Sequence, residues 1–315
     1  MIILRPILKQ VWKNIAVMDQ KRISLLTPDT GITKIQDIVY LEDGHPLHQM
    51  DVDYPDEADI PFNVDKKYPV IIDIHGGGWI YGDKELNDYY CLSLVKMNFT
   101  VVNISYRLVP EVTVKEQVQD IFAALTRFYV IASKDIGRIK YHADMDKIFV
   151  TGDSAGGMLT GLITLINGSD KLQKIYGVKA LPFTIRAIGL TCPVPFILAG
   201  TVENKSAIRR EMGKMIFGGA YKKSSLKGAV SMEDIIDEAP LPPVFIITAT
   251  DDQECYYQAV MLDKLLTEKN VIHEYCCKEP DRAPLGHVFN IIYPHNPEAE
   301  EVNRRMTEFF LETIS

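Results

Sequence analysis

The sequence predicts an α/β fold with a mostly parallel eight-stranded sheet, helices on both faces of the sheet and a small helical cap. Most of the predicted strands are nearly continuous apolar runs, and helical patterns separate most of these runs from one another. Such runs are typical of strands buried on both faces, and the helices between them supply the crossover connections that a parallel sheet requires. A length of 315 residues suits one α/β domain with a smaller appendage.

The first two predicted strands differ from the others because polar and apolar residues alternate in them, as at an antiparallel edge of a sheet. They cover residues 35–41 and 47–54, and the hairpin signal Glu42-Asp43-Gly44 joins them. The acidic residues 51–57 fit no metal-binding loop, and we expect a solvated strand end there. The apolar strands are predicted at residues 68–74, 99–105, 147–150, 186–191, 243–248 and 271–277, and the helices at 84–96, 112–131, 155–166, 254–268 and 297–314.

Two segments lie outside this alternation and are predicted to form the cap of a single domain that covers residues 1–315. Residues 1–35 have apolar side chains at helical spacing, which fits either a core-facing helix or a lid over the top of the sheet. Residues 193–242 contain helical pieces but no convincing strand. An insertion of this length between two core strands is typical of a cap over an active site.

The composition excludes several classes of function. A net charge of −8 argues against binding to nucleic acid or to an anionic membrane surface. The five cysteines are an odd number without Cys-x-x-Cys spacing, which disfavours a disulfide framework and a zinc site. Because no cleavable leader and no segment of membrane-spanning length is recognisable, we expect a cytoplasmic protein without a membrane span.

The pattern Gly-x-Ser-x-Gly at residues 152–156 joins a predicted strand directly to a predicted helix. In that context Ser154 is expected at a sharp, strained turn that lifts its hydroxyl clear of the sheet edge. The helix beginning at Ala155 would point free N–H groups toward the space above the serine, where negative charge develops in acyl transfer. Ser154 is therefore the predicted nucleophile. The alternative is a tight turn that requires glycine and happens to contain a serine.

A nucleophilic serine needs a base and a group that orients the base. In doubly wound enzymes of this kind the acid and then the histidine follow the serine along the chain. His287 lies on the loop after the last predicted strand and is the predicted base, with a surface-loop histidine as the alternative. The predicted acid is Asp252, after the strand at 243–248, and Asp251 is the second choice. The remaining acids there would cap the following helix.

The stretch His75-Gly76-Gly77-Gly78-Trp79 follows a predicted strand and leaves its backbone N–H groups uncovered. Two of these N–H groups, joined by that of Ala155, would stabilise the developing oxyanion. His75 is expected to brace the loop by hydrogen bonding rather than to titrate in the reaction. A phosphate-binding loop is disfavoured because neither Gly-x-x-x-x-Gly-Lys nor Gly-x-Gly-x-x-Gly is present.

Three motifs together resemble those of α/β-hydrolase carboxylesterases of the hormone-sensitive-lipase-like branch. They are His75-Gly76-Gly77-Gly78-Trp79, Tyr106-Arg107-Leu108-Val109-Pro110-Glu111 and Gly152-Asp153-Ser154-Ala155-Gly156-Gly157, and the likeness covers roughly residues 35–315. The resemblance implies an α/β-hydrolase fold that needs no metal or cofactor. It further implies Ser154 as nucleophile, His287 as general base and acid, an Asp at position 252, and an oxyanion hole formed by the amides of Gly76, Gly77 and Ala155.

The sequence departs from the family pattern at the acid and the histidine. Gln253 and Glu254 follow Asp252 where the family usually has proline and leucine, and Val288 follows His287 in place of a small residue. The first departure keeps Asp251 open as the acid. Tyr106 and Arg107 are interpreted as structural, supporting the oxyanion loop from the neighbouring strand.

These observations predict a serine carboxylesterase that cleaves short-chain acyl esters, acetyl esters included, through an acyl-serine intermediate. Its expected partner is a small-molecule ester, and a homodimer is a candidate assembly. A peptidase or amidase of the same fold is the first alternative. A small-molecule receptor that has lost catalysis is the second, and the presence of His287 disfavours it because receptors of this fold typically lack the histidine.

Overall fold

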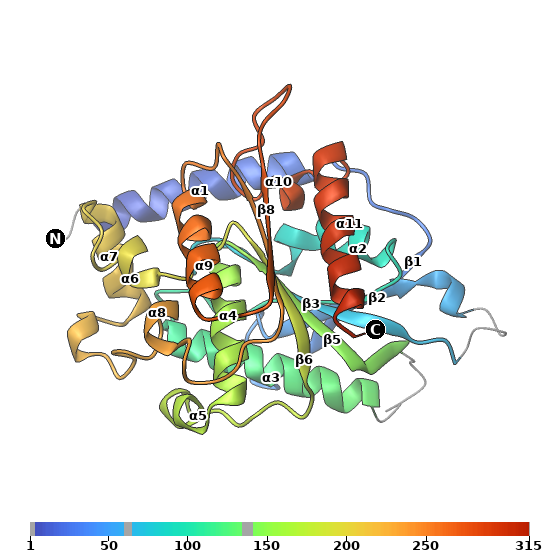
Figure 1. The fold of residues 1–315 in the computed structure, drawn as a ribbon, viewed down its shortest axis with the longest axis horizontal. Coiled ribbons are helices and arrows are strands. Elements are labelled where there is room, and N and C mark those ends of the chain that lie inside the picture. The colour runs from blue at the N-terminus through green and yellow to red at the C-terminus, as the bar shows by residue number, and fades with distance from the viewer. Residues whose placement is uncertain (1–3, 60–64, 134–140, 315) are drawn as a thin grey trace.

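The structure is a computed structural model that describes residues 4–59, 65–133 and 141–314 (Figure 1). Its eight-stranded sheet has the order β1-β2-β4-β3-β5-β6-β7-β8. β2 pairs antiparallel with both β1 and β4, and the other neighbours pair parallel, which confirms the predicted fold class. The strands are β1 (Ile32–Val39), β2 (Gln49–Pro55), β3 (Tyr68–Ile74), β4 (Thr100–Ile104), β5 (Ala143–Asp153), β6 (Ile185–Thr191), β7 (Val244–Ala249) and β8 (His273–Lys278).

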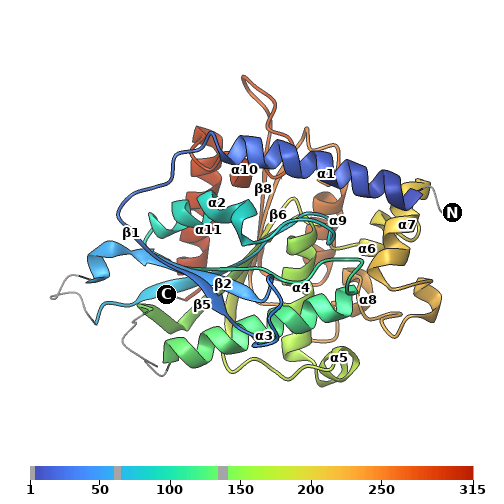
Figure 2. The same cartoon turned by 180° about the vertical axis from the view of Figure 1, so that it is seen from behind.

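Helices cover both faces of this sheet, as Figures 1 and 2 show from opposite sides. α2 and α11 pack on one face, and α3, α4 and α9 pack on the other. The helices are α1 (Leu4–Ile23), α2 (Asp88–Val95), α3 (Val114–Ser133), α4 (Ala155–Gly168), α5 (Asp170–Tyr176), α6 (Ile197–Gly200), α7 (Ala207–Ile216), α8 (Met232–Ile235), α9 (Tyr256–Glu268), α10 (Phe289–Ile292) and α11 (Pro297–Glu312). Short 3₁₀ turns are η1 (Asp56–Asp59), η3 (Lys84–Asn87) and η4 (Tyr221–Lys223).

The two apolar cores follow from the two-residue period of the central strands. Along β5, Ile148 and Val150 belong to the core under α3 and α4, whereas Phe149 belongs to the core under α11. Phe149 stacks on Phe310 of α11, with ring centroids 4.7 Å apart. β5 is thus held firmly on both faces where it delivers the chain to Ser154.

The structure differs from the expected elements at three places. The N-terminal helix was expected to reach residue 35, but α1 ends at Ile23 and residues 32–39 form β1. α5 was not predicted, although Ser169 caps its start and Gly177, with φ of 71°, ends it. The expectation of a solvated strand end at residues 51–57 is wrong, because Asp51 and Asp53 are buried in β2. Lys84 Nζ lies 3.0 Å from Asp51, and burial raises the pKa of Asp53 to about 7.

α1 runs along one end of the sheet, and α6 and α7 lie beside its N-terminal part in both ribbon views (Figures 1 and 2). Arg5 of α1 donates from Nε to Glu211 Oε1 of α7 at 3.0 Å, which ties the two segments together. No helix within the described ranges is long and apolar enough to cross a membrane. The assignment of these segments to a cap within one domain stays a prediction.

Candidate active site

Ser154 stands between the end of β5 and the start of α4 with φ of 52° and ψ of −115°. This backbone conformation is rare for a residue with a side chain and is typical of functional turns. The turn is held by the Ser154 N–H, which donates to Thr191 O at 2.8 Å. Two residues after Ser154, a Cβ at Gly156 would lie 2.0 Å from Ile74 O, so only glycine lets α4 approach the end of β3 this closely.

His287 and Asp252 meet at the ends of two different segments. His287 Nδ1 lies 3.0 Å from Asp252 Oδ2, and Asp252 is 1% exposed. The other carboxylate oxygen, Oδ1, accepts from the N–H groups of Glu254 and Cys255 at 2.9 and 3.0 Å. Backbone donors therefore fix one oxygen of Asp252 and leave the second directed at the imidazole.

Asp251, the second choice for the acid, has a different set of partners. Its carboxylate accepts from the N–H groups of Leu285 and Gly286 at 2.9 and 3.0 Å. Asp251 thus anchors the backbone of the loop that carries His287, whereas Asp252 contacts the ring itself. Val288, which follows His287, has φ of 50°. This angle is strained for a β-branched residue and shows that the loop is tightly held.

The charges of the pair are mutually dependent. Burial is the largest influence on Asp252 and would raise its pKa, but the hydrogen bond and charge of His287 and the hydrogen bonds from Cys192 and Cys255 together hold the pKa below the usual 3.8. Burial is the largest influence on His287 and opposes its protonation, but the hydrogen bonds with Asp252, Cys192 and Cys255 together outweigh burial and raise the pKa of the imidazole well above 6.5. Asp252 therefore stabilises the imidazolium form of His287.

Ser154 and His287 line the same cavity of about 510 Å³, and Asp252 lies behind the histidine. No hydrogen bond joins the Ser154 hydroxyl to His287 in the part of the chain that the structure describes. Contacts of this kind are often long in the absence of substrate and tighten when it binds. The cavity places the serine hydroxyl and the imidazole on one surface.

The structure disagrees with the prediction that Gly76 supplies an oxyanion donor. Its N–H donates to Asp153 Oδ1 at 2.8 Å, so this group is already occupied behind the loop. Gly77 and Gly78 line the cavity beside Ser154, and neither N–H has an acceptor among the described residues. We therefore replace Gly76 by Gly78 as a candidate donor, alongside Gly77 and Ala155.

Two buried rings support the predicted oxyanion loop, residues 75–79. His75 is fully buried, its Nδ1 lies 2.9 Å from Gly76 O, and burial lowers its pKa to about 4, so the ring is neutral. Tyr106 stacks on His75 with ring centroids 4.4 Å apart and donates its hydroxyl to His75 O at 2.6 Å. Arg107 points elsewhere and pairs with Asp120 of α3. The supporting role expected of this motif therefore belongs to Tyr106.

α1 forms a wall of the cavity, which its sequence pattern alone could not place. Leu8, Trp12 and Ile15 line the cavity from the helix. Trp12 lies directly on the oxyanion loop: a Cβ at Gly78, which has φ of 60°, would lie 2.5 Å from the indole ring. Nearer its C-terminus, Arg22 donates to Ile292 O at 3.1 Å, close to the histidine loop.

Two charged pairs accompany this apolar wall. Asp19 and Arg22 of α1 pair at 3.2 Å, and Asp19 also accepts from the Tyr81 hydroxyl at the same distance. Arg209 of α7 pairs with Glu254, which follows the predicted acid by two residues. All of these side chains line the cavity. No sequence motif pointed to them.

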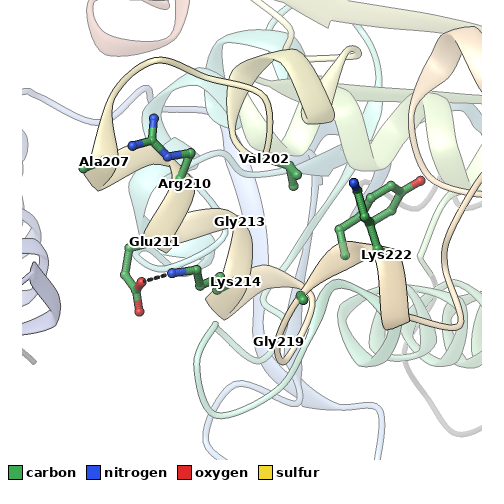
Figure 3. A pocket seen from close by; sticks show the side chains of 10 residues that line it. Val202, Ala207, Arg210, Glu211, Gly213, Lys214, Gly219 and Lys222 are labelled. Atoms are coloured by element: carbon green, nitrogen blue, oxygen red, sulfur yellow. Dashed lines mark hydrogen bonds and ion pairs between the residues drawn. The ribbon is translucent and has the colours of Figure 1, made fainter. Parts of the chain in front are cut away.

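A second cavity, of about 350 Å³, is lined by α7 and by the segment that follows it (Figure 3). Arg210, Glu211, Lys214 and Lys222 are among the residues that line it, and Glu211 pairs with Lys214 at 3.0 Å. None of the predicted catalytic residues lies there. The predicted nucleophile and base both line the larger cavity.

Comparison with known families agrees with the α/β fold of the chain. A model of the BD-FAE family matches residues 58–266, which is more than half of the chain and includes Ser154 and Asp252. The chain belongs to the BD-FAE family. This BD-FAE chain is an α/β hydrolase, and the match ends before His287, whose placement comes from the structure alone.

Among curated relatives, neutral cholesterol ester hydrolase 1 of Rattus norvegicus is 35% identical over 96 residues, covering 30% of this chain and 22% of that protein. Esterase LipI of Mycobacterium tuberculosis is 34% identical over 110 residues, covering 35% of this chain and 30% of that protein. The BD-FAE chain thus matches less than a third of the length of these relatives.

Solved structures are similar over nearly the whole chain. A structure of esterase B from Lactobacillus rhamnosis has a TM-score of 0.87 and 27% identity, covering 98% of the BD-FAE chain and 96% of that chain. A hyperthermophilic esterase from Pyrobaculum calidifontis has a TM-score of 0.67 and 20% identity, covering 98% and 92%, and shows likeness of fold alone. The eight-stranded hydrolase architecture is therefore shared along almost the full length.

Proposed function

We propose that this BD-FAE family member is a serine carboxylesterase that hydrolyses short-chain acyl esters. The observation that carries the proposal is the pairing of His287 with the buried Asp252 at the edge of the cavity that contains Ser154. A hydroxyl at a strained turn, an imidazole and an orienting carboxylate are the three groups that acyl transfer through serine requires.

In the proposed reaction, His287 Nε2 accepts the proton of the Ser154 hydroxyl while Oγ attacks the ester carbonyl carbon. The imidazolium that forms is stabilised by Asp252, 3.0 Å away. His287 then gives the proton to the alkoxide oxygen as the bond to the alcohol breaks, which leaves an acyl-serine. Water attacks the acyl group, passes a proton to His287, and the carboxylic acid leaves as that proton returns to Ser154.

The developing oxyanion has three candidate donors. The N–H groups of Gly77 and Gly78 belong to the loop that Trp12 covers, and that of Ala155 belongs to the first residue of α4. Donors at a helix start and on a rigid loop need no reorganisation when the charge appears, and each such donor is worth about 10²–10³ in rate. Asp153 supports the arrangement indirectly, since it holds Gly76 and with it the start of the loop.

The choice of a short acyl chain rests on the cavity and on one relative. α1 forms one wall of the cavity of about 510 Å³, and Leu8, Trp12 and Ile15 make this wall apolar. Esterase B from Lactobacillus rhamnosis, 27% identical to this chain, was crystallised after inhibition by a tributyrin phosphonate. Butyrate esters of small alcohols therefore fit the proposal.

The experiment is hydrolysis of p-nitrophenyl esters from acetate to long chains by the wild type and by Ser154→Ala, with aminoacyl anilides as a parallel series. We expect turnover to be highest for short chains and to fall by at least about 10⁴-fold in the variant. Faster turnover of the anilides would favour the peptidase alternative. Unchanged activity in Ser154→Ala would refute the assignment of the nucleophile.

A further inference from the structure

Cys192 lies beside the predicted triad, and nothing in the proposed mechanism uses it. It follows β6 directly and is fully buried. Its N–H donates to Ile247 O at 2.7 Å, and its sulfur accepts from the Val288 N–H at 3.4 Å. Backbone contacts from β7 and from the histidine loop thus fix the thiol between the two segments that carry Asp252 and His287.

The side chains of these three residues converge. One ligand atom from each, the Cys192 sulfur, an Asp252 oxygen and a His287 nitrogen, lie within 4.8 Å of one another. Thiolate, imidazole and carboxylate are the donors that zinc prefers, and donors around one tetrahedral zinc ion stand about 3.3–3.7 Å apart. A contraction of at most about 1.5 Å would bring the three atoms, which lie within 4.8 Å of one another, onto one ion.

We propose that a thiophilic divalent cation, Zn²⁺ or Cd²⁺, binds Cys192, Asp252 and His287 and thereby inhibits the hydrolase. Metal binding at His287 Nδ1 replaces the hydrogen bond from this nitrogen to Asp252. The Nδ1 proton of the neutral ring moves to Nε2, so Nε2 can no longer accept the proton of Ser154. The ion forms a bond to the Cys192 sulfur, and the thiol proton is released to solvent. Inhibition, though not binding, rests on the proposed function of the triad.

The surroundings supply an entry path and set the pH dependence. The side chain of His287 is 32% exposed and faces the cavity, so an ion reaches the imidazole from solvent. Cys255 also lines the cavity and hydrogen-bonds with His287, which adds a second sulfur beside the path. Burial raises the pKa of the Cys192 thiol to about 11, against the effect of its hydrogen bond with His287. Because the ion must displace that proton, affinity rises with pH.

The first experiment titrates ZnCl₂ and CdCl₂ against ester hydrolysis, with MgCl₂ as the hard-cation comparison, in the wild type, Cys192→Ser and Cys277→Ser. Each variant is normalised to its own metal-free activity. Cys277 in β8 is half-buried and does not line the cavity, so it controls for adventitious thiol binding. We expect the inhibitory concentration to rise at least about tenfold only in Cys192→Ser, with full recovery on adding EDTA. Equal sensitivity of the wild type and Cys192→Ser overturns the proposal.

The second experiment measures binding without activity. Cd²⁺ is added to Ser154→Ala and to Ser154→Ala with Cys192→Ser, and the ultraviolet absorption of the cadmium–thiolate bond is recorded. We expect a one-equivalent signal in the first protein and its loss in the second. This readout tests the site even if the chain proves to hydrolyse no ester, whereas absence of the signal in the first protein refutes the site itself.

Discussion

Replacing Asp252 by asparagine tests the triad sharply because the structure dictates how the amide must lie. Two N–H donors, those of Glu254 and Cys255, hold Oδ1 at 2.9 and 3.0 Å. In Asp252→Asn the amide oxygen must occupy this position, so the NH₂ group faces His287 Nδ1. Nδ1 then accepts a hydrogen bond, the ring proton moves to Nε2, and Nε2 can no longer accept the proton of Ser154.

The expected cost is large. An asparagine that imposes the wrong tautomer on a serine hydrolase lowers kcat by about 10⁴-fold, which corresponds to about 5.4 kcal/mol of activation free energy. The assay is the kcat and KM for p-nitrophenyl butyrate, with thermal unfolding as the measure of integrity. Because aspartate and asparagine have nearly the same shape and the two backbone donors stay paired, the melting temperature should change little.

Asp251→Asn is the matched control, since it likewise replaces one oxygen of the neighbouring carboxylate by an NH₂ group. Asp251 accepts from Leu285 and Gly286, and one of these N–H groups would face the amide NH₂ instead. We expect a loss of about 1–3 kcal/mol in stability and only a modest loss in kcat. The reasoning is refuted if Asp252→Asn keeps a tenth of wild-type kcat, or if Asp251→Asn is the more damaging to kcat.

Three further predictions concern pH, the oxyanion loop and the core. Only the neutral ring of His287 can accept the serine proton, and the pKa of this ring is raised, so kcat/KM should fall as the pH drops through a midpoint above 6.5. A midpoint below 6.5 in the pH profile of kcat/KM would contradict the raised pKa. Gly78→Ala should lower kcat by about 10²–10³, since its Cβ would lie 2.5 Å from Trp12 and displace the loop. Adding Trp12→Ala should restore part of the activity, and a single variant as active as wild type would contradict the expected displacement of the loop. Phe149→Ala should lower the free energy of unfolding by about 3–5 kcal/mol in urea denaturation, because the ring is fully buried and stacked on Phe310. A loss under about 1 kcal/mol would show that the core around this ring is loosely packed.

The alternation of strands and helices along the chain and the turn at Ser154 were accessible from sequence because they depend on local patterns. Buried parallel strands require continuous apolar runs, and the turn at Ser154 requires glycine on either side. Strand pairing confirms the sheet, and the backbone angles at Ser154 are those that such a turn demands. The roles assigned to Ser154, Asp252 and His287 stay predictions until the variants are measured.

What the sequence could not show depends on contacts between distant segments. Gly76 and Gly78 look alike in the motif, and only the hydrogen bond from Gly76 to Asp153, 77 residues later, separates them. Asp51 and Asp53 were expected at a solvated strand end because the alternation of polar and apolar residues does not show which neighbouring elements cover a strand. Their burial depends on strand pairing with β4 and on Lys84, which lies on a different segment. The meeting of Cys192 with the triad has the same origin.

The position of α1 places the residues that shape the cavity on a different segment from the candidate catalytic groups. Every candidate catalytic group lies on a loop attached to the central sheet, whereas much of the cavity wall belongs to a peripheral helix of 20 residues held by Arg5, Trp12 and Arg22. Changes on the inner side of that helix alter the shape offered to an acyl chain without touching the sheet. Substrate range and reaction chemistry therefore depend on different segments of this chain. Substitutions in α1 can change the substrate range during evolution while the catalytic groups stay the same.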